Sequence, residues 1–341
     1  MNNTEEIALD PAFLVPTEFI GRYKLLSVLG HGSMASVYLA YDPALDREIA
    51  LKTLNSGVSG KYAKLFEENF IDEARAVARL NYPNIVTVYD AGKEDGYAYI
   101  AMEYLEGQDL RQLMWNDTRL SYVAICDLMM RVARALDYAH RHGVVHRDIK
   151  PANIFLLRKN RPKLLDFGLA QLPIGTAIDP AEHPCHSQIA GTPYYMSPEH
   201  AAGQPLDGRS DIFSLGIILY ELLTLRKPFD AKRPQQVLEQ IRHSAPPLPH
   251  ELRASVPHEL EMIVLRALAK DPAKRYQTAH ELAKDLGRYS TKARTRKVLE
   301  RAQASARRHL PPSDHGTRLP WLKMGSGWLN AWFGATTQIS R

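Results

Sequence analysis

The sequence is poor in cysteine and shows no secretion signal. Of its 341 residues only Cys126 and Cys185 are cysteine. Two cysteines are too few for a disulfide framework, and this fits a reducing compartment. Residues 1–10 are polar and acidic. They lack the basic region followed by an apolar core that is typical of a signal peptide. We therefore expect a cytoplasmic protein.

Long apolar runs are also missing. No stretch of about 18 apolar residues is present, which is the length that a membrane-spanning helix needs. The most apolar run, residues 212–225, contains Ser214, Gly216 and Glu221. It is too short and too polar to span a membrane, and we expect a buried core helix there.

The net charge of +5 is unevenly distributed. After residue 291 there are ten lysines and arginines against two acidic residues, a net charge of +8, which leaves −3 for residues 1–291. The basic character therefore belongs to the tail. The hydrophobic fraction of 45% and the charged fraction of 24% are those of a soluble globular protein. The length suits two lobes, or one large domain followed by a tail.

Oxygen ligands gather around a predicted hairpin. Residues 154–157 and 163–165 are apolar runs of strand type, and Asn160 and Pro162 mark a turn between them. The start of one antiparallel strand lies beside the end of its partner. We therefore expect Asn153 and Asp166 to be neighbours, with Asp148 nearby on the same loop. Carboxylate and amide oxygens suit a magnesium–phosphate site.

Further upstream, glycines lie between two predicted strands. Residues 23–29 and 38–40 have strand character, and Gly30 and Gly32 separate them. Glycines let backbone amides approach phosphate oxygens, although an ordinary hairpin turn explains the same pattern. A dinucleotide-binding motif is disfavoured, because that motif opens a helix.

A lysine and a glutamate follow in this half of the chain. Residues 49–52 form a short apolar strand that ends at Lys52. Residues 61–80 read as a helix in which Phe66, Phe70, Glu73 and Val77 share a face. A carboxylate in an apolar stripe needs a partner, unless Glu73 lies at the solvated edge of that stripe.

Beyond these segments the chain is mainly helical. Residues 85–89 and 97–102 read as strands. Residues 121–141 read as a helix with Ser121 as its N-cap and Gly143 as its stop. Further helices are predicted over residues 211–225, 260–269 and 278–286, the last with a capping box from Thr278 to Glu281.

At these residues the sequence resembles the eukaryotic-like (Hanks-type) protein kinases, and most closely the bacterial Ser/Thr kinases. Residues 146–153 (HRDIKPAN) match the catalytic loop H-R-D-L-x-x-x-N with Ile149 for leucine, and residues 166–168 are DFG. Residues 30–37 match G-x-G-x-x-G-x-V except for Ala35 at the third glycine. Residues 49–52 are similar to V-A-I-K, and residues 197–199 (SPE) to A-P-E. The likeness covers residues 23–289 with the motifs in the family's order.

The resemblance implies an α+β, two-lobed kinase fold. A small, mainly antiparallel β lobe with one helix would span residues 23–103. A hinge would span residues 103–107, and a larger, mainly α-helical lobe residues 108–291. Residues 1–22 would form an N-terminal extension, and residues 292–341 a basic, tryptophan-containing tail.

The resemblance also implies transfer of the γ-phosphate of ATP to Ser/Thr hydroxyls. Asp148 would orient the hydroxyl, Lys150 would contact the transferred phosphate, and Lys52, fixed by Glu73, would position the phosphates. Mg²⁺ would be held by Asn153 and Asp166. The full set expected to bind the cofactors is Leu29, Gly30, Gly32, Val37, Ala50, Lys52, Glu73, Met102, Glu103, Leu105, Asn153 and Asp166.

The family's activation segment would run from Asp166 to residues 197–199, where Glu199 would pair with Arg275. Arg147 beside Asp148 suggests activation by phosphorylation of that segment. Ser187 is the preferred site and Thr176 the second, whereas Thr192 is better read as structural. Residues 191–195 resemble the part that holds a peptide substrate.

Several other interpretations fit the sequence less well. A pseudokinase would lack Lys52, Asp148 or Asp166, and all three are present. Nucleic-acid binding is disfavoured by the negative charge of residues 1–291. The crowded His183, Cys185 and His186 do not suit a metal site. The tail could be disordered or dock on the kinase body or a partner, and contact with a membrane is not favoured. The expected partners are Ser/Thr-bearing protein substrates and an opposing phosphatase.

Overall fold

The computed structural model describes residues 18–32, 35–54, 63–116, 119–167 and 193–308. Residues 1–294 and residues 295–341 form two separate units. Over the described ranges, no helix has both the length and the apolar character needed to cross a membrane. The expectations for residues 168–192, including Ser187, Thr176 and Thr192, lie outside the described residues. So does the cluster of tryptophans in the tail.

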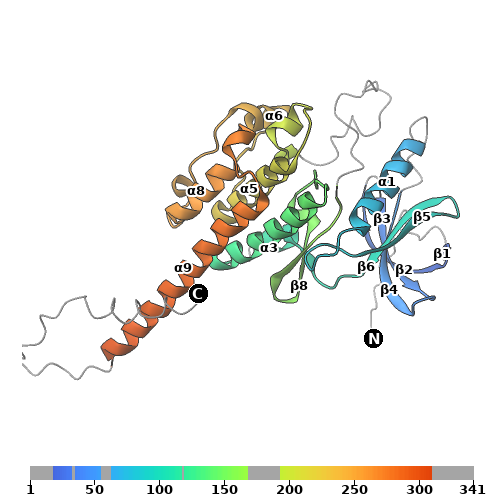
Figure 1. Ribbon diagram of the computed structural model, residues 1–341, viewed down its shortest axis with the longest axis horizontal. Coiled ribbons are helices and arrows are strands. Elements are labelled where there is room, and N and C mark those ends of the chain that lie inside the picture. The colour runs from blue at the N-terminus through green and yellow to red at the C-terminus, as the bar shows by residue number, and fades with distance from the viewer. Residues whose placement is uncertain (1–17, 33–34, 55–62, 117–118, 168–192, 309–341) are drawn as a thin grey trace, which may run out of the picture. The chain divides into compact units, whose positions relative to one another are not determined.

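The first lobe is built on a six-stranded antiparallel sheet with the order β1-β2-β3-β4-β6-β5 (Figure 1). Its strands are β1 (Phe19–Ile20), β2 (Tyr23–His31), β3 (Ala35–Asp42), β4 (Arg47–Leu54), β5 (Val88–Glu94) and β6 (Tyr97–Glu103). Helix α1 (Ala63–Ala78) packs against β5 and β6.

Alternation along the strands divides the apolar residues of this sheet between two faces. In β3, buried and half-buried residues alternate along the whole strand, as a period of two requires. One face forms its own small core, which includes Ile20, Tyr23 and Leu51. The other face joins the main core of the protein, where Ala50 packs in the same cluster as Phe70 of α1.

The second lobe is helical and surrounds the almost fully buried helix α5 (Gly208–Thr224). The other helices are α2 (Leu110–Trp115), α3 (Tyr122–Arg141), α4 (Pro198–Ala201), α6 (Pro234–His243), α7 (Pro249–Leu252), α8 (His258–Ala267) and α9 (Ala279–Arg308). A small sheet of β7 (Gln108–Asp109), β8 (Ile154–Leu157) and β9 (Arg161–Leu164) lies with them.

Local sequence features explain where α3 and α5 begin and why α5 can lie close to α8. The Ser121 hydroxyl accepts a hydrogen bond from the amide of Ala124 at 3.2 Å and caps α3. The Asp207 carboxylate accepts one from the amide of Arg209 at 2.8 Å and caps α5. In α5, Gly216 lets the helix approach α8, because a Cβ there would lie 2.9 Å from the Cβ of Ala267.

The predicted fold class is confirmed by these two lobes. Helices α1, α3, α5 and α8 and most of the predicted strands lie close to their predicted positions, whereas β5 lies later than the predicted residues 85–89. Pro162, predicted in the turn of the hairpin, instead lies in β9 and pairs with Leu156. The short strands β1 and β7 and the helices α2, α4, α6 and α7 were not predicted.

The last predicted helix, over residues 278–286, is too short. Helix α9 starts where the predicted capping signal lies, with the amide of Glu281 donating to the Thr278 hydroxyl at 3.3 Å. It then continues to Arg308. Residues 287–308 contain no proline and are rich in arginine, lysine and alanine, which all favour helix. The basic composition therefore indicated an exposed helix, not a linker.

A buried ion pair ties the start of α4 to the segment before α9, as predicted. The guanidinium of Arg275 donates to both carboxylate oxygens of Glu199, at 2.7 and 2.8 Å. The Ser210 hydroxyl donates to the same carboxylate at 2.6 Å. The remaining Arg275 donors reach backbone carbonyls, including those of Ala269 and Lys270. Both buried charges are thus fully hydrogen-bonded, which a buried pair requires.

We expect Arg275→Met to lower the free energy of unfolding by about 3–5 kcal/mol, because it leaves the Glu199 carboxylate buried without its partner. Urea unfolding followed by circular dichroism measures the change. The control is Arg75→Ala, whose exposed ion pair with Asp72 predicts a loss of about 1 kcal/mol or less. Equal losses in the two variants would contradict the importance of the buried pair.

The same pair predicts a pH dependence of stability. Burial raises the pKa of Glu199, but hydrogen bonds from Arg275 and Ser210 outweigh it, so this pKa lies below the ordinary 4.5. A lowered folded-state pKa contributes stability above the unfolded pKa, and this contribution is lost as the pH falls through the folded value. The difference in unfolding free energy between the wild type and Glu199→Gln should therefore shrink below about pH 4.5. A difference that stays constant from pH 7 to 3 argues against this assignment.

Candidate active site

The hairpin of β8 and β9 brings Asn153 and Asp166 together, as predicted. Ile154 pairs with Leu164 at the mouth of the hairpin. The amide of Leu165 donates to the Asn153 carbonyl at 2.9 Å. The side-chain amide of Asn153 lies 3.5 Å from the carbonyl oxygen of Asp166.

The Asp148 carboxylate is held from two directions. The Lys150 ammonium donates to its Oδ2 at 2.7 Å, and the side-chain amide of Asn153 donates to the same oxygen at 3.0 Å. The Asn153 amide also donates to the Asp148 carbonyl at 2.8 Å. Because Nδ2 faces Asp148, the Oδ1 of Asn153 points elsewhere, and no hydrogen bond to it is found among the described residues.

His146 is fully buried, and its ring holds this loop through two hydrogen bonds. Its Nε2 lies 3.0 Å from the Leu165 carbonyl and must donate there, so Nδ1 is free to accept the amide of Asp148 at 3.3 Å. This is the neutral form, and burial lowers the pKa of His146 in agreement with it. The ring stacks on Phe167 with centroids 4.4 Å apart.

Asp211, in the first turn of α5, fixes the backbone of the loop. Its carboxylate accepts the amides of His146 and Arg147, both at 2.8 Å, and the Nε2–H of His140 at 2.7 Å. Arg147 has a positive φ of 67°, which is uncommon for a non-glycine residue. The bonds to Asp211 offset the cost of that conformation.

Sequence reasoning missed Asp211. The available signal was a carboxylate within the first turn of the most apolar helix, where an unpaired charge is costly. Burial raises the pKa of Asp211, but its bond to His140 and the nearby charges outweigh this, so the pKa lies below its ordinary value. Asp211 is therefore ionised and can accept from both amides.

Lys52 reaches from β4 to Asp166 of the other lobe. Its Nζ lies 2.8 Å from the Asp166 Oδ1, and its side chain is only 14% exposed. Burial lowers the pKa of Lys52, but the charges of Asp166 and the buried Glu73 outweigh it and raise the pKa. For Asp166, burial raises the pKa and Lys52 lowers it, with a net shift downward. Both groups stay charged at neutral pH.

The residues expected around a nucleotide lie on neighbouring strands. Gly30 of β2 pairs with Val37 of β3, and Ala50 of β4 pairs with Met102 of β6. The amide of Gly32 donates to the Ala35 carbonyl at 2.9 Å and closes the turn between β2 and β3. Residues 33–34 at the tip are outside the described residues. Leu29 is 44% exposed, and Leu105 is half-buried.

The segment between the lobes is fastened through Glu103. Its Oε1 accepts the amide of Thr87 at 2.7 Å and pairs with the ammonium of Lys163 from β9. Lys163 also donates to the Ile85 carbonyl at 3.2 Å. Gly107, at the end of this segment, has a φ of 157°, and a Cβ there would lie 2.1 Å from the Leu156 carbonyl oxygen. No residue other than glycine fits at position 107.

The donor set at the hairpin fits magnesium. Within the described residues, no group of three or more His, Cys, Asp or Glu side chains could hold a metal ion. Asn153 and Asp166 instead offer an amide oxygen and a carboxylate. Mg²⁺ commonly uses one or two such protein ligands and completes its shell with water and substrate phosphates.

Comparison with known proteins agrees with this geometry. The family model "Protein kinase domain" matches residues 23–286. A probable serine/threonine-protein kinase of Streptomyces coelicolor is 40% identical over 80% of this chain and 40% of its own length. Serine/threonine-protein kinase PknB of Mycolicibacterium smegmatis is 37% identical over 88% of this chain and 48% of its own. The chain thus spans less than half the length of these relatives.

Solved structures lead to the same family. The kinase domain of PknI from Mycobacterium tuberculosis is 30% identical and superimposes with a TM-score of 0.63. The match covers 79% of this chain and 97% of that domain. Together with the antiparallel sheet, the helical lobe and the loop around Asp148, these matches show that the chain belongs to the protein kinase family, alongside bacterial serine/threonine kinases.

Proposed function

We propose that this chain is a Ser/Thr protein kinase that transfers the γ-phosphate of ATP to hydroxyls of proteins. The observation that carries the proposal is the arrangement around Asp148. Its carboxylate is held by Lys150 and Asn153, next to the Lys52–Asp166 pair. Such a site positions two reactants and neutralises phosphate charge, and this is most of what phosphoryl transfer needs.

In the proposed reaction, Asp148 accepts a hydrogen bond from the substrate hydroxyl and takes its proton as the oxygen attacks the γ-phosphorus. The bond between that phosphorus and the bridging oxygen breaks, and ADP leaves. Lys150 lies 2.7 Å from Asp148, close enough to contact the transferred phosphoryl group. Mg²⁺ held by Asn153 and Asp166 would neutralise charge on the phosphates.

The nucleotide would lie between the strands and the hairpin. Lys52, steadied by the charge of Glu73, would contact the phosphates. The backbone of Gly30 and Gly32 would approach them closely. The adenine would lie against Ala50 and Met102 and meet the backbone of residues 103–105. The Glu103 side chain is already engaged by Lys163 and Thr87, which supports recognition through main-chain atoms there.

We further propose control by phosphorylation within the activation segment. Arg147 supports this, because its backbone is fixed by Asp211 while its side chain is exposed and forms no ion pair with the described residues. An arginine held in this way is suited to bind a phosphate. Ser187 remains the preferred acceptor and Thr176 the second.

Location and partners are also proposals. A cytoplasmic location rests on the two cysteines, of which Cys126 is buried and free. The partners would be Ser/Thr-bearing protein substrates and a phosphatase that opposes the kinase. Nucleic-acid binding and contact of the tail with a membrane are not favoured.

We expect Asp148→Asn to lower the phosphorylation rate about 100-fold or more, since general-base catalysis typically contributes that much. Incorporation of radiolabel from ATP into the protein itself and into a mixed Ser/Thr peptide library measures it. Binding of a fluorescent ATP analogue should change little, because Asp148 acts on the hydroxyl.

The matched control is Asp72→Asn, an exposed aspartate of α1 that pairs only with Arg75 among the described residues. This variant should keep the wild-type rate. Equal label in Asp148→Asn and the wild type would refute the mechanism, and no label in any variant would favour a pseudokinase.

Phosphosite mapping tests the proposed control. Mass spectrometry of the active protein should find phosphate between residues 171 and 190, most of it at Ser187. Arg147→Ala should reduce activation by this modification while leaving the basal rate unchanged. Active enzyme without phosphate in that range would exclude the activation model.

A further inference from the structure

Helix α5 ends in an unusual way. Its C-cap residue, Leu225, has a φ of 62° and a ψ of 22°, the left-handed conformation in which helices usually place glycine. The Leu225 side chain is nonetheless large, apolar and 49% exposed. Burial of about half of the side chain therefore offsets only part of the cost of this conformation. Such outliers often mark a functional surface.

The turn around Leu225 is rigid. The Leu225 amide donates to the Glu221 carbonyl at 2.8 Å. The Thr224 hydroxyl lies 2.9 Å from both the Tyr220 and the Arg226 carbonyls, and it accepts the amide of Arg226 at 3.2 Å. The turn therefore holds Leu225 and Arg226 in a fixed position before any partner arrives, which lowers the entropic cost of binding.

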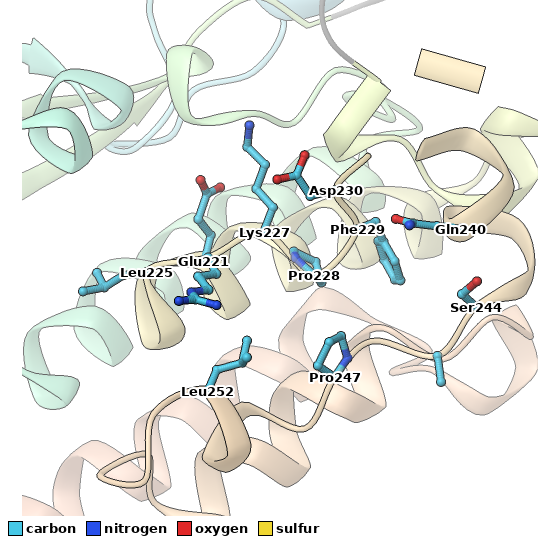
Figure 2. Close-up of a pocket in the computed structure, with 12 residues that line it drawn as sticks. Glu221, Leu225, Lys227, Pro228, Phe229, Asp230, Gln240, Ser244, Pro247 and Leu252 are labelled. Atoms are coloured by element: carbon cyan, nitrogen blue, oxygen red, sulfur yellow. The ribbon is translucent and has the colours of Figure 1, made fainter. Parts of the chain in front are cut away.

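Two cavities meet at this turn, because Glu221 and Leu225 line both. The larger has a volume of about 770 Å³ and the smaller about 210 Å³. Figure 2 shows the larger cavity, with Leu225 at one end and Leu252 and Pro247 across from Glu221 and Pro228. Apolar side chains dominate the smaller one, namely Met114, Leu120, Ile125, Leu222 and Leu225. We call the two together the α5 groove.

Arginines line both cavities of the α5 groove. Arg119 and Arg253 line the smaller cavity, and Arg226 the larger. Arg253 donates to the Leu223 carbonyl at 3.1 Å and lies over the Tyr122 ring at 5.3 Å. Neither Arg253 nor Arg226 forms an ion pair with a carboxylate of the described residues. The groove therefore combines apolar walls with unneutralised positive charge.

The two acidic side chains of the groove, Glu221 and Asp230, are outnumbered by its four basic ones, which are Arg119, Arg226, Lys227 and Arg253. One oxygen of Glu221 accepts the Tyr195 hydroxyl at 2.7 Å, and burial raises the pKa of Glu221 above its ordinary value. Asp230 lines only the larger cavity, where Lys227 lies over the Tyr194 ring at 3.6 Å.

We propose that the α5 groove docks an acidic segment with large apolar side chains that belongs to a protein substrate. Leucine- or phenylalanine-type side chains of the substrate would fill the cavities on either side of Leu225. Its Asp or Glu side chains would pair with Arg226 and Arg253. The proposal rests on the kinase function proposed above.

A link to the acceptor site favours a substrate as the occupant. Tyr194 and Tyr195 belong to a short 3₁₀ helix, Pro193–Tyr195, in the stretch that resembles the peptide-holding part of kinases. Tyr195 is bonded to Glu221 in the wall of the groove. A chain bound along the α5 groove would thus run close to the place where the acceptor residue is held.

A direct binding experiment tests the surface without catalysis. The probes are two fluorescein-labelled 12-residue peptides that alternate Leu or Phe with acidic residues in one and with lysines in the other. Fluorescence anisotropy with the full chain should show binding of the acidic peptide and at least about tenfold weaker binding of the basic one. Equal binding of both, or of neither, would overturn the proposal.

Two variants locate the binding. Leu225→Gly should weaken binding of the acidic peptide about tenfold, because it removes a buried apolar contact. The same change should raise Tm, because glycine relieves the left-handed strain. Arg226→Glu should weaken binding about tenfold and reduce its salt dependence. The controls are Leu26→Ala, a leucine 45% exposed on β2, and Arg288→Glu on α9, and both should bind like the wild type.

A steady-state kinetic experiment tests whether the groove binds substrates. A Ser-containing acceptor peptide is compared with the same peptide joined to the acidic segment. In the wild type the extension should lower KM several-fold and leave kcat unchanged, and Leu225→Gly should abolish this gain. If no variant phosphorylates either peptide, the proposed function fails while the binding result still decides the docking surface. Equal KM values for the two peptides in active wild type would exclude substrate docking.

Discussion

The loop around Asp148 depends on one buried carboxylate. Asp211 accepts two consecutive loop amides and the His140 ring, so a helix of the core determines the path of residues outside it. The hydrogen bond from the Arg147 amide to Asp211 stabilises the positive φ of Arg147. His146 then connects two further parts of the loop. Its Nδ1 accepts the amide of Asp148, and its Nε2 donates to the Leu165 carbonyl. A residue of the most apolar helix, α5, therefore fixes the backbone conformation of the loop.

The two lobes meet through charged groups as well as through the chain itself. Lys52 from β4 reaches Asp166, and Lys163 from β9 reaches Glu103 at the end of β6. Each lobe thus supplies one lysine and one carboxylate to these two ion pairs. The amide and carbonyl of Leu164 add backbone bonds to Asn84 and Val86 at 2.8 and 2.9 Å. The strand of the hairpin that ends near Asp166 is thus also fastened to the small lobe.

Local sequence patterns predicted most of the strands and helices and the hairpin at the site because they act over short distances, whereas the two-lobed fold came from the family resemblance. The hairpin put Asn153 beside Asp166, and strand register put Lys52 near the end of β4. The pairing of Glu199 with Arg275 came from the family resemblance alone, since 76 residues separate them. Asp211 and Lys163 were not predicted, because their partners are reached through tertiary packing that no periodicity encodes. The extent of α9 was missed because basic composition was weighed above helix propensity.

The side-chain amide of Asn153 has a consequence for the charge balance of the site. Its hydrogens face Asp148, so an aspartate there would set two carboxylates against each other. With the amide, the ionisable groups are two lysines and three carboxylates, namely Lys52, Lys150, Glu73, Asp148 and Asp166. The sum is one negative charge, which repels a polyanion. Under the proposed function, a bare nucleoside triphosphate would therefore bind poorly, and an accompanying divalent cation would supply the missing counter-charge.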